Sequence, residues 1–168
     1  MSLDALARTG PAASSTQPAS AVWAPPEGWR AIERSAVVAA ARDWPRVRDA
    51  ALHWVVKRRA GFAIPPGRAT AGERLLVTAR LGPLIVREPI EVVEVVDEPA
   101  RAGFAYATLA GHPVAGEEAF VVHVEADAVV LTVRSLARAA PSGPWRVAFP
   151  VLRVVQVVAL RRYLRALR

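Results

Sequence analysis

The segment GHPVAGEEAF, residues 111–120, contains the side chains best suited to proton transfer. His112 lies between a glycine and a proline, and an imidazole exchanges protons near neutral pH. Turn chemistry favours the simpler interpretation, in which His112 hydrogen-bonds to nearby backbone. Glu117 and Glu118 are adjacent, so on a strand they point to opposite faces and cannot act together as acid and base. The segment therefore predicts at most one carboxylate facing a cavity.

Glu118 is the carboxylate that we expect to face inward. Phe120, Val122 and Val124 share its strand face and are apolar. A carboxylate buried among them needs an arginine or histidine partner. Arg134, in the last predicted strand, is a candidate partner for Glu118 or for an acidic group of a ligand. The alternative is that Arg134 is solvated at the sheet surface.

Tyr106 and Trp54 complete the candidate ligand-binding residues. Tyr106 shares a predicted strand face with Phe104 and Thr108, so its hydroxyl could contact a ligand. Core packing with a satisfied hydroxyl is the favoured interpretation. Trp54 is the expected core-facing residue of the first helix.

The sequence predicts neither a metal site nor a cofactor. It contains no cysteine, which removes thiolate chemistry and cysteine-based metal sites. His53 and His123 belong to no metal-ligand spacing. The glycines are scattered, so no phosphate-binding loop or dinucleotide fingerprint is present.

The length and composition predict one folded domain after a tail. The chain has 168 residues, of which 53% are hydrophobic. Residues 1–22 are rich in alanine, serine, threonine and proline and are expected to form a flexible tail, leaving a single domain at 23–168. The first residues do not resemble a secretory signal, and no segment is apolar enough to span a membrane. A cytoplasmic location is the default expectation, and the oligomeric state is left open.

The net charge of +7 raises the question of an anionic partner. Basic residues cluster at 57–59 and 161–168 but alternate with acids elsewhere, and all except Lys57 are arginine. That bias, together with the abundance of alanine and valine, is typical of a GC-rich genome. We therefore expect no nucleic-acid partner.

Periodicity predicts the order strand, helix, five strands and a long terminal helix. The expected strands are Trp29–Val38, Glu73–Gly82, Leu84–Pro99, Gly103–Gly111, Glu117–Asp127 and Ala128–Ala140, with an edge position or a bulge at Pro89. The expected helices are Asp43–Gly61 and 144–167. The front half of the terminal helix is apolar almost all round, so we expect a curved antiparallel sheet to enclose it. The fold class is α+β.

Four segments resemble an uncharacterised protein family, number 0548, found in bacteria and plants. They are WRAIERSAVV, LHWVVKRRAG, VVDEPARAGFAYATLAGHPVAGEEAFVV and RRYLRAL, and the match runs from about Pro25 to Leu167. SLARAA at 135–140 departs from the family, where a phenylalanine and a serine are expected before the arginine. The resemblance implies kinship with the START-like helix-grip superfamily, in which a sheet grips a C-terminal helix over a cavity for apolar ligands. It implies no reaction.

Three functions follow as hypotheses. The first is a binder of an apolar small molecule or lipid-like ligand, held between the sheet and the C-terminal helix. The second is an enzyme that uses His112, Glu118 and Tyr106 for proton transfer on a carbonyl or ester compound, which requires those side chains to converge. The third is a basic module for anionic surfaces that uses the bases at 57–59 and at 161–168.

Overall fold

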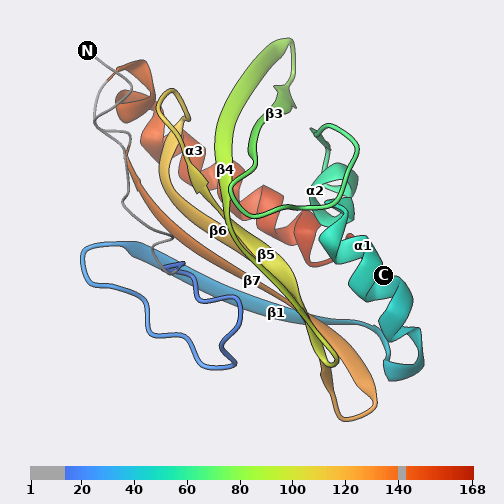
Figure 1. Ribbon diagram of the computed structural model, residues 1–168. Helices are drawn as coiled ribbons and strands as arrows, with labels where there is room; N and C mark the ends of the chain where they lie inside the picture. Colours follow the sequence, from blue (N-terminus) through green and yellow to red (C-terminus); the bar gives the residue numbers. More distant parts are fainter. Residues whose placement is uncertain (1–13, 140–142) are drawn as a thin grey trace.

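The computed structural model describes residues 14–139 and 143–168 and contains one antiparallel sheet with helices on one face (Figure 1). The strands pair in the order β1-β7-β6-β5-β4-β3-β2. Their bounds are Arg30–Ala40 (β1), Phe62–Ala63 (β2), Arg74–Leu81 (β3), Leu84–Glu98 (β4), Arg101–Thr108 (β5), Val114–Glu125 (β6) and Ala128–Ala139 (β7). The predicted five-stranded meander is present as β3 to β7. The sequence anticipated neither β2 nor the pairing of β1 with β7.

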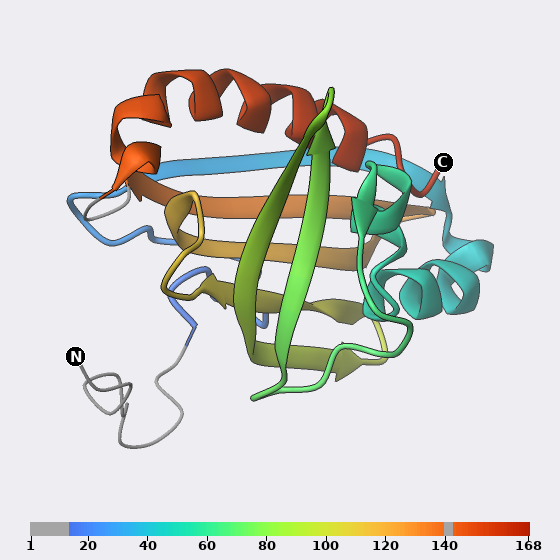
Figure 2. The same ribbon diagram turned by 90° about the horizontal axis from the view of Figure 1, so that it is seen from above.

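Register shifts bend the sheet. One lies between Val37 and Ala39 in β1, and another between Val92 and Glu94 in β4. Such bulges raise the local twist, and in Figure 2 the hairpin of β3 and β4 runs across the direction of β1, β7 and β6. Pro89 pairs with Leu76 of β3, whereas the pairing of β4 with β5 begins only at the next residue, Ile90, so Pro89 lies at the predicted edge position although most of β4 is paired on both sides.

The predicted helix Asp43–Gly61 is broken into α1 (Trp44–Leu52) and α2 (Val55–Arg59), preceded by a short 3-10 helix, η2 (Ala41–Asp43). Trp54 separates α1 from α2 with a φ of 63°, a left-handed conformation that bulky residues rarely adopt. Its indole is 1% exposed and its ring centroid lies 4.2 Å from that of Phe104. The break between α1 and α2 therefore occurs where the indole packs in the core. It changes which side chains of α2 face the core.

The terminal helix α3 (Pro144–Tyr163) lies along the sheet, but the sheet does not enclose its front half (Figure 2). Tyr163 at its end is buried, and the Tyr163 and Phe120 rings meet edge to face at 4.8 Å. Val147 and Val151, by contrast, are 83% and 66% exposed. The expectation of an enclosed front half is wrong, because the sheet covers only one side of the helix.

Helices and the N-terminal segment cover opposite faces of the sheet. Trp54, Phe104 and Phe120 belong to the core on the helix side, which we call the inner face. On the outer face, residues 14–22 contact the sheet, and Ser14 and Thr16 are buried. Composition assigned these residues to the tail, but the structure describes them as packed. Residues 1–13 of that predicted tail lie outside the described residues, and so do 140–142.

Candidate functional site

A cavity of about 430 Å³ lies between the inner face of the sheet and α3. Apolar side chains line much of it, among them Phe62, Val86, Leu152 and Val155. A volume of this size suits a small organic ligand. The polar residues Lys57, Tyr106, Glu88, Glu118 and His112 line it as well. The cavity therefore combines an apolar wall with a small charged cluster.

Lys57 of α2 is the centre of that cluster. It is 2% exposed, and its Nζ lies 4.4 Å from the centroid of the Phe62 ring and 4.6 Å from that of Tyr106. Nζ also lies 3.6 Å from Glu118 Oε2 and 3.8 Å from Glu88 Oε2. Aromatic faces and carboxylates both attract a cation, so the side chains around Lys57 complement its positive charge.

Tyr106 joins Lys57 to Glu118 through its hydroxyl. Lys57 Nζ donates to Tyr106 Oη, and Tyr106 Oη donates to Glu118 Oε2. Burial raises the pKa of Tyr106 well above its ordinary value, and the negative charge of Glu118 raises it further. The phenol therefore keeps its proton and acts as a donor. The expected partner of Glu118 was an arginine or histidine, whereas the structure supplies a lysine and a tyrosine.

Glu88 and His112 lie beside this chain of hydrogen bonds. Burial raises the pKa of Glu88, although Lys57 opposes that effect. Burial, together with the positive charge of Lys57, lowers the pKa of His112 to about 3. His112 Nδ1 accepts a hydrogen bond from the backbone N–H of Val114 at 3.0 Å, and Nε2 lies 3.9 Å from Glu88 Oε2. Neutral His112 therefore carries its proton on Nε2, which leaves no ring nitrogen to act as a base.

The structure brings together some of the predicted site residues and separates others. Tyr106, His112 and Glu118 all line the cavity. Trp54 does not line it, because its indole packs in the core against Phe104 and Tyr106.

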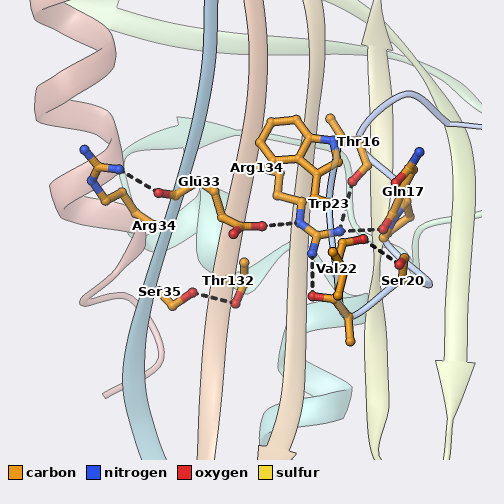
Figure 3. Close-up of polar contacts among 12 residues, drawn as sticks. Thr16, Gln17, Ser20, Val22, Trp23, Glu33, Arg34, Ser35, Thr132 and Arg134 are labelled. Carbon is orange, nitrogen blue, oxygen red and sulfur yellow. Dashed lines mark hydrogen bonds and ion pairs between the residues drawn. The ribbon is translucent and has the colours of Figure 1, made fainter. Parts of the chain in front are cut away.

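Arg134 lies on the outer face, where its guanidinium faces Glu33 and the N-terminal segment (Figure 3), and it does not line the cavity. Its Nε donates to Glu33 Oε2 at 2.6 Å. Its remaining nitrogens donate to the backbone carbonyls of Thr16, Gln17 and Ala21. Arg134 is therefore neither the partner of Glu118 nor solvated, since it is 1% exposed and anchors the N-terminal segment.

Glu117 binds the N-terminal segment on the same outer face. Its carboxylate accepts hydrogen bonds from the backbone N–H groups of Ser15 and Thr16 and from the hydroxyls of Ser14 and Thr16. Glu117 and Glu118 therefore do point to opposite faces, one toward the N-terminal segment and the other toward the cavity.

Sequence reasoning missed Lys57 and Glu88. Lys57 was assigned to a basic surface, which its burial excludes. One signal was available, since Lys57 is the single lysine in a chain whose other bases are arginine. Glu88 gave no comparable signal.

No group of three or more histidine, cysteine, aspartate or glutamate side chains in residues 14–139 and 143–168 is arranged to hold a metal ion. In the same part of the chain, none of the helices has the length and apolar character to cross a bilayer.

A family model described as Domain of unknown function (DUF1990) matches residues 13–166. No protein with a curated description matches the chain in sequence. The match to the family model covers the sheet, the cavity and α3 together.

Solved structures share the fold. A hypothetical protein from Helicobacter pylori superposes with a TM-score of 0.57 at 11% identity, covering 84% of this chain and 86% of its own. Norcoclaurine synthase from Thalictrum flavum, in complex with dopamine and hydroxybenzaldehyde, gives 0.51 at 16% identity, with 81% and 84% covered. An aromatase/cyclase from Streptomyces sp. R1128 gives 0.53 at 14% identity, with 81% and 92% covered. The predicted helix-grip fold, a curved antiparallel sheet with a C-terminal helix, is confirmed.

Proposed function

The chain belongs to the family described as Domain of unknown function (DUF1990), and because that description assigns no activity, we propose a function from the cavity. The protein binds a small, largely apolar molecule that presents a neutral hydrogen-bond acceptor to Lys57. Membership of the family numbered 0548 stays a prediction.

The observation that carries this proposal is the buried ammonium of Lys57 on the wall of an apolar cavity of about 430 Å³. An ammonium has three N–H donors. Nζ makes one hydrogen bond within the described part of the chain, to Tyr106, and its carboxylate neighbours lie beyond hydrogen-bond distance. A ligand oxygen can therefore accept a hydrogen bond from Lys57 without displacing Tyr106.

The charges around Lys57 favour a neutral ligand group. Glu88 and Glu118 both lie within 4 Å of Nζ, so the cation already has acidic partners. A ligand carboxylate would add a like charge next to them, which costs energy in a buried site. A carbonyl or hydroxyl oxygen accepts the hydrogen bond without that cost.

Proteins with this fold support the proposal by analogy alone. The Thalictrum flavum enzyme was solved with dopamine and hydroxybenzaldehyde, which are small aromatic molecules. A ligand of comparable size suits the cavity described here.

Native mass spectrometry of protein purified from expressing cells tests the proposal, since a bound molecule adds a discrete mass. Ala159→Phe fills the cavity from α3, whereas Val157→Phe places the same ring on the same helix at a residue that does not line the cavity. We expect the added mass to be lost in Ala159→Phe and kept in Val157→Phe. Protein without any added mass, also after incubation with hydroxybenzaldehyde, would contradict the proposal.

A second candidate function is proton transfer to a bound carbonyl compound. It is favoured by the chain of hydrogen bonds from Lys57 through Tyr106 to Glu118, in which a donor and a carboxylate meet at the cavity wall. His112 cannot serve as the base in this scheme, because its Nδ1 is occupied and its Nε2 is protonated. Deuterium exchange at the carbon next to the carbonyl of a bound ketone, lost in Glu118→Gln, would support it.

A further inference from the structure

One exposed side of α3 is apolar, whereas the exposed side of a surface helix is ordinarily polar. Four valines, spaced so that they fall on one side of a helix, form what we call the valine stripe: Val147, Val151, Val154 and Val158. Their exposed fractions are 83%, 66%, 66% and 43%. A surface helix turns its apolar stripe toward the core, so this arrangement exposes apolar area that a partner is expected to cover.

Arginines flank the valine stripe and continue it. Arg153 lies within the span of the stripe, and Arg161, Arg162, Arg165 and Arg168 follow it along the chain. No aspartate or glutamate occurs between residue 128 and the C-terminus. At the end of the helix, Arg59 joins Arg162, Arg165 and Arg168 around a hollow of about 300 Å³. The helix dipole accounts for bases at this end, but it does not account for exposed valines.

Exposed valines beside arginines favour one kind of partner. A second copy of the chain packed on the same face would join two surfaces whose α3 helices carry arginines and no acidic residue, so no opposite charge from α3 would pair across the contact. Nucleic acid would satisfy the arginines and leave the valines uncovered. A bilayer with anionic lipids accommodates both, since headgroups pair with arginines and the acyl boundary receives the valines.

We infer that α3 docks the protein on anionic membrane surfaces, with the valine stripe in the interface and the C-terminal arginines against lipid headgroups. The helix lies in the plane of the membrane and does not cross it. Leu84 and Ile85, which are 53% and 54% exposed in the β3–β4 hairpin, add apolar area, and the hairpin turn reaches the level of α3 in Figure 2. Val154 and Val158 also line the cavity, so its opening adjoins the docking face.

Flotation of the full chain with vesicles tests this inference. Vesicles of phosphatidylcholine and phosphatidylglycerol in equal amounts are compared with vesicles of phosphatidylcholine alone. The test variant is Val147→Ser with Val151→Ser, two residues that do not line the cavity, and the control is Val37→Ser, which is 58% exposed on β1. We expect binding to the anionic vesicles, a drop in affinity of about tenfold in the double variant, and no change in the control.

Arg161→Gln with Arg165→Gln should weaken binding to the same vesicles, and raised salt should weaken it further. Three results would overturn the inference: no flotation of the native chain, flotation that does not depend on the valines, or a dimer in solution that becomes a monomer in the valine variant. The last result would assign the stripe to a second copy. Because Val147 and Val151 lie outside the cavity, the mass retained in native spectra should not change in this variant, which separates the docking surface from ligand binding.

Discussion

Lys57 Nζ lies 3.6 Å from Glu118 Oε2, on the wall of a cavity that both residues line. The two come from different parts of the fold, α2 and β6, and the hydroxyl of Tyr106 lies between them. A charged pair in such a place adds little net stability, because each ion loses its hydration on burial. The effect of Lys57 on the free energy of unfolding therefore depends on the presence of Glu118, and the reverse also holds.

Lys57→Met tests that dependence. The substitution leaves Glu88 and Glu118 without their cation, so we expect the free energy of unfolding to fall by about 3 kcal/mol at neutral pH. Urea denaturation measures the change. The double variant Lys57→Met with Glu118→Gln should recover part of the loss, because it removes one uncompensated carboxylate. If the two variants are equally unstable, the pair is not coupled as the geometry indicates.

His112 predicts a dependence of stability on pH. Its pKa is lowered from 6.5 to about 3 in the folded protein, so the unfolded chain binds a proton more tightly between those values. Stability from this group is present above pH 6.5 and falls as the pH drops toward 3, by about 3 kcal/mol on reaching pH 4. His112→Gln should flatten that fall relative to the native chain. Parallel curves for native protein and His112→Gln would refute the assignment.

The raised pKa of Glu88 makes stability depend on pH in the direction opposite to that of His112. A carboxylate whose folded pKa lies above its unfolded pKa binds its proton more tightly when folded, so it stabilises the fold at acidic pH and loses that contribution as the pH rises through the folded value. Glu88→Gln keeps the size of the side chain without the charge. We expect it to raise the free energy of unfolding at neutral pH and to change it little at pH 4. Denaturation at both pH values measures this, and a loss of stability at neutral pH would contradict it.

Strand alternation predicted much of the sheet, whereas side-chain partners depended on register. The meander and the terminal helix follow from periodicity, and the hairpin around residues 109–113 follows from turn chemistry. Arg134 was paired with Glu118 because both were assumed to face the same side. The register instead places Ala119 opposite Arg134 and Ser135 opposite Glu118. A shift of one residue moves a side chain to the other face, and sequence alone does not fix it.

The sequence also did not predict which side of the segment 43–61 faces the core. A regular helix over 43–61 places Arg58 with Trp54 on the core side, but the left-handed backbone at Trp54 interrupts that phase. Lys57 is buried as a result, and Arg58 donates hydrogen bonds to the carbonyls of His53 and Pro65. The break accompanies contact between Trp54 and Phe104, which are far apart in sequence. Local propensity carries no information about such a contact.

Arg134→Met tests the attachment of the N-terminal segment. The guanidinium joins Glu33 to three backbone carbonyls of that segment. Cζ of Arg134 also lies 5.7 Å from the centroid of the Trp23 ring. Methionine keeps the apolar stem but loses every donor, so we expect faster hydrogen exchange at residues 14–22 and a loss of about 3 kcal/mol in stability. Arg34→Met is the control, because that side chain makes an exposed hydrogen bond to the backbone of Glu33. Unchanged exchange at residues 14–22 would mean that Arg134 does not hold the segment.

Tyr106→Phe isolates the hydroxyl between the lysine and the carboxylate. The change removes the acceptor of Lys57 and the donor to Glu118 while keeping the ring, whose centroid lies 6.0 Å from that of Trp54. Because both partners are buried charged groups, we expect the free energy of unfolding to fall by about 2 kcal/mol in urea denaturation. Tyr163→Phe is a matched control, since Tyr163 also lines the cavity and its hydroxyl makes no hydrogen bond within the described residues. Equal losses in the two variants would show that the hydroxyl of Tyr106 has no special role, and the chain of hydrogen bonds would then not organise the site.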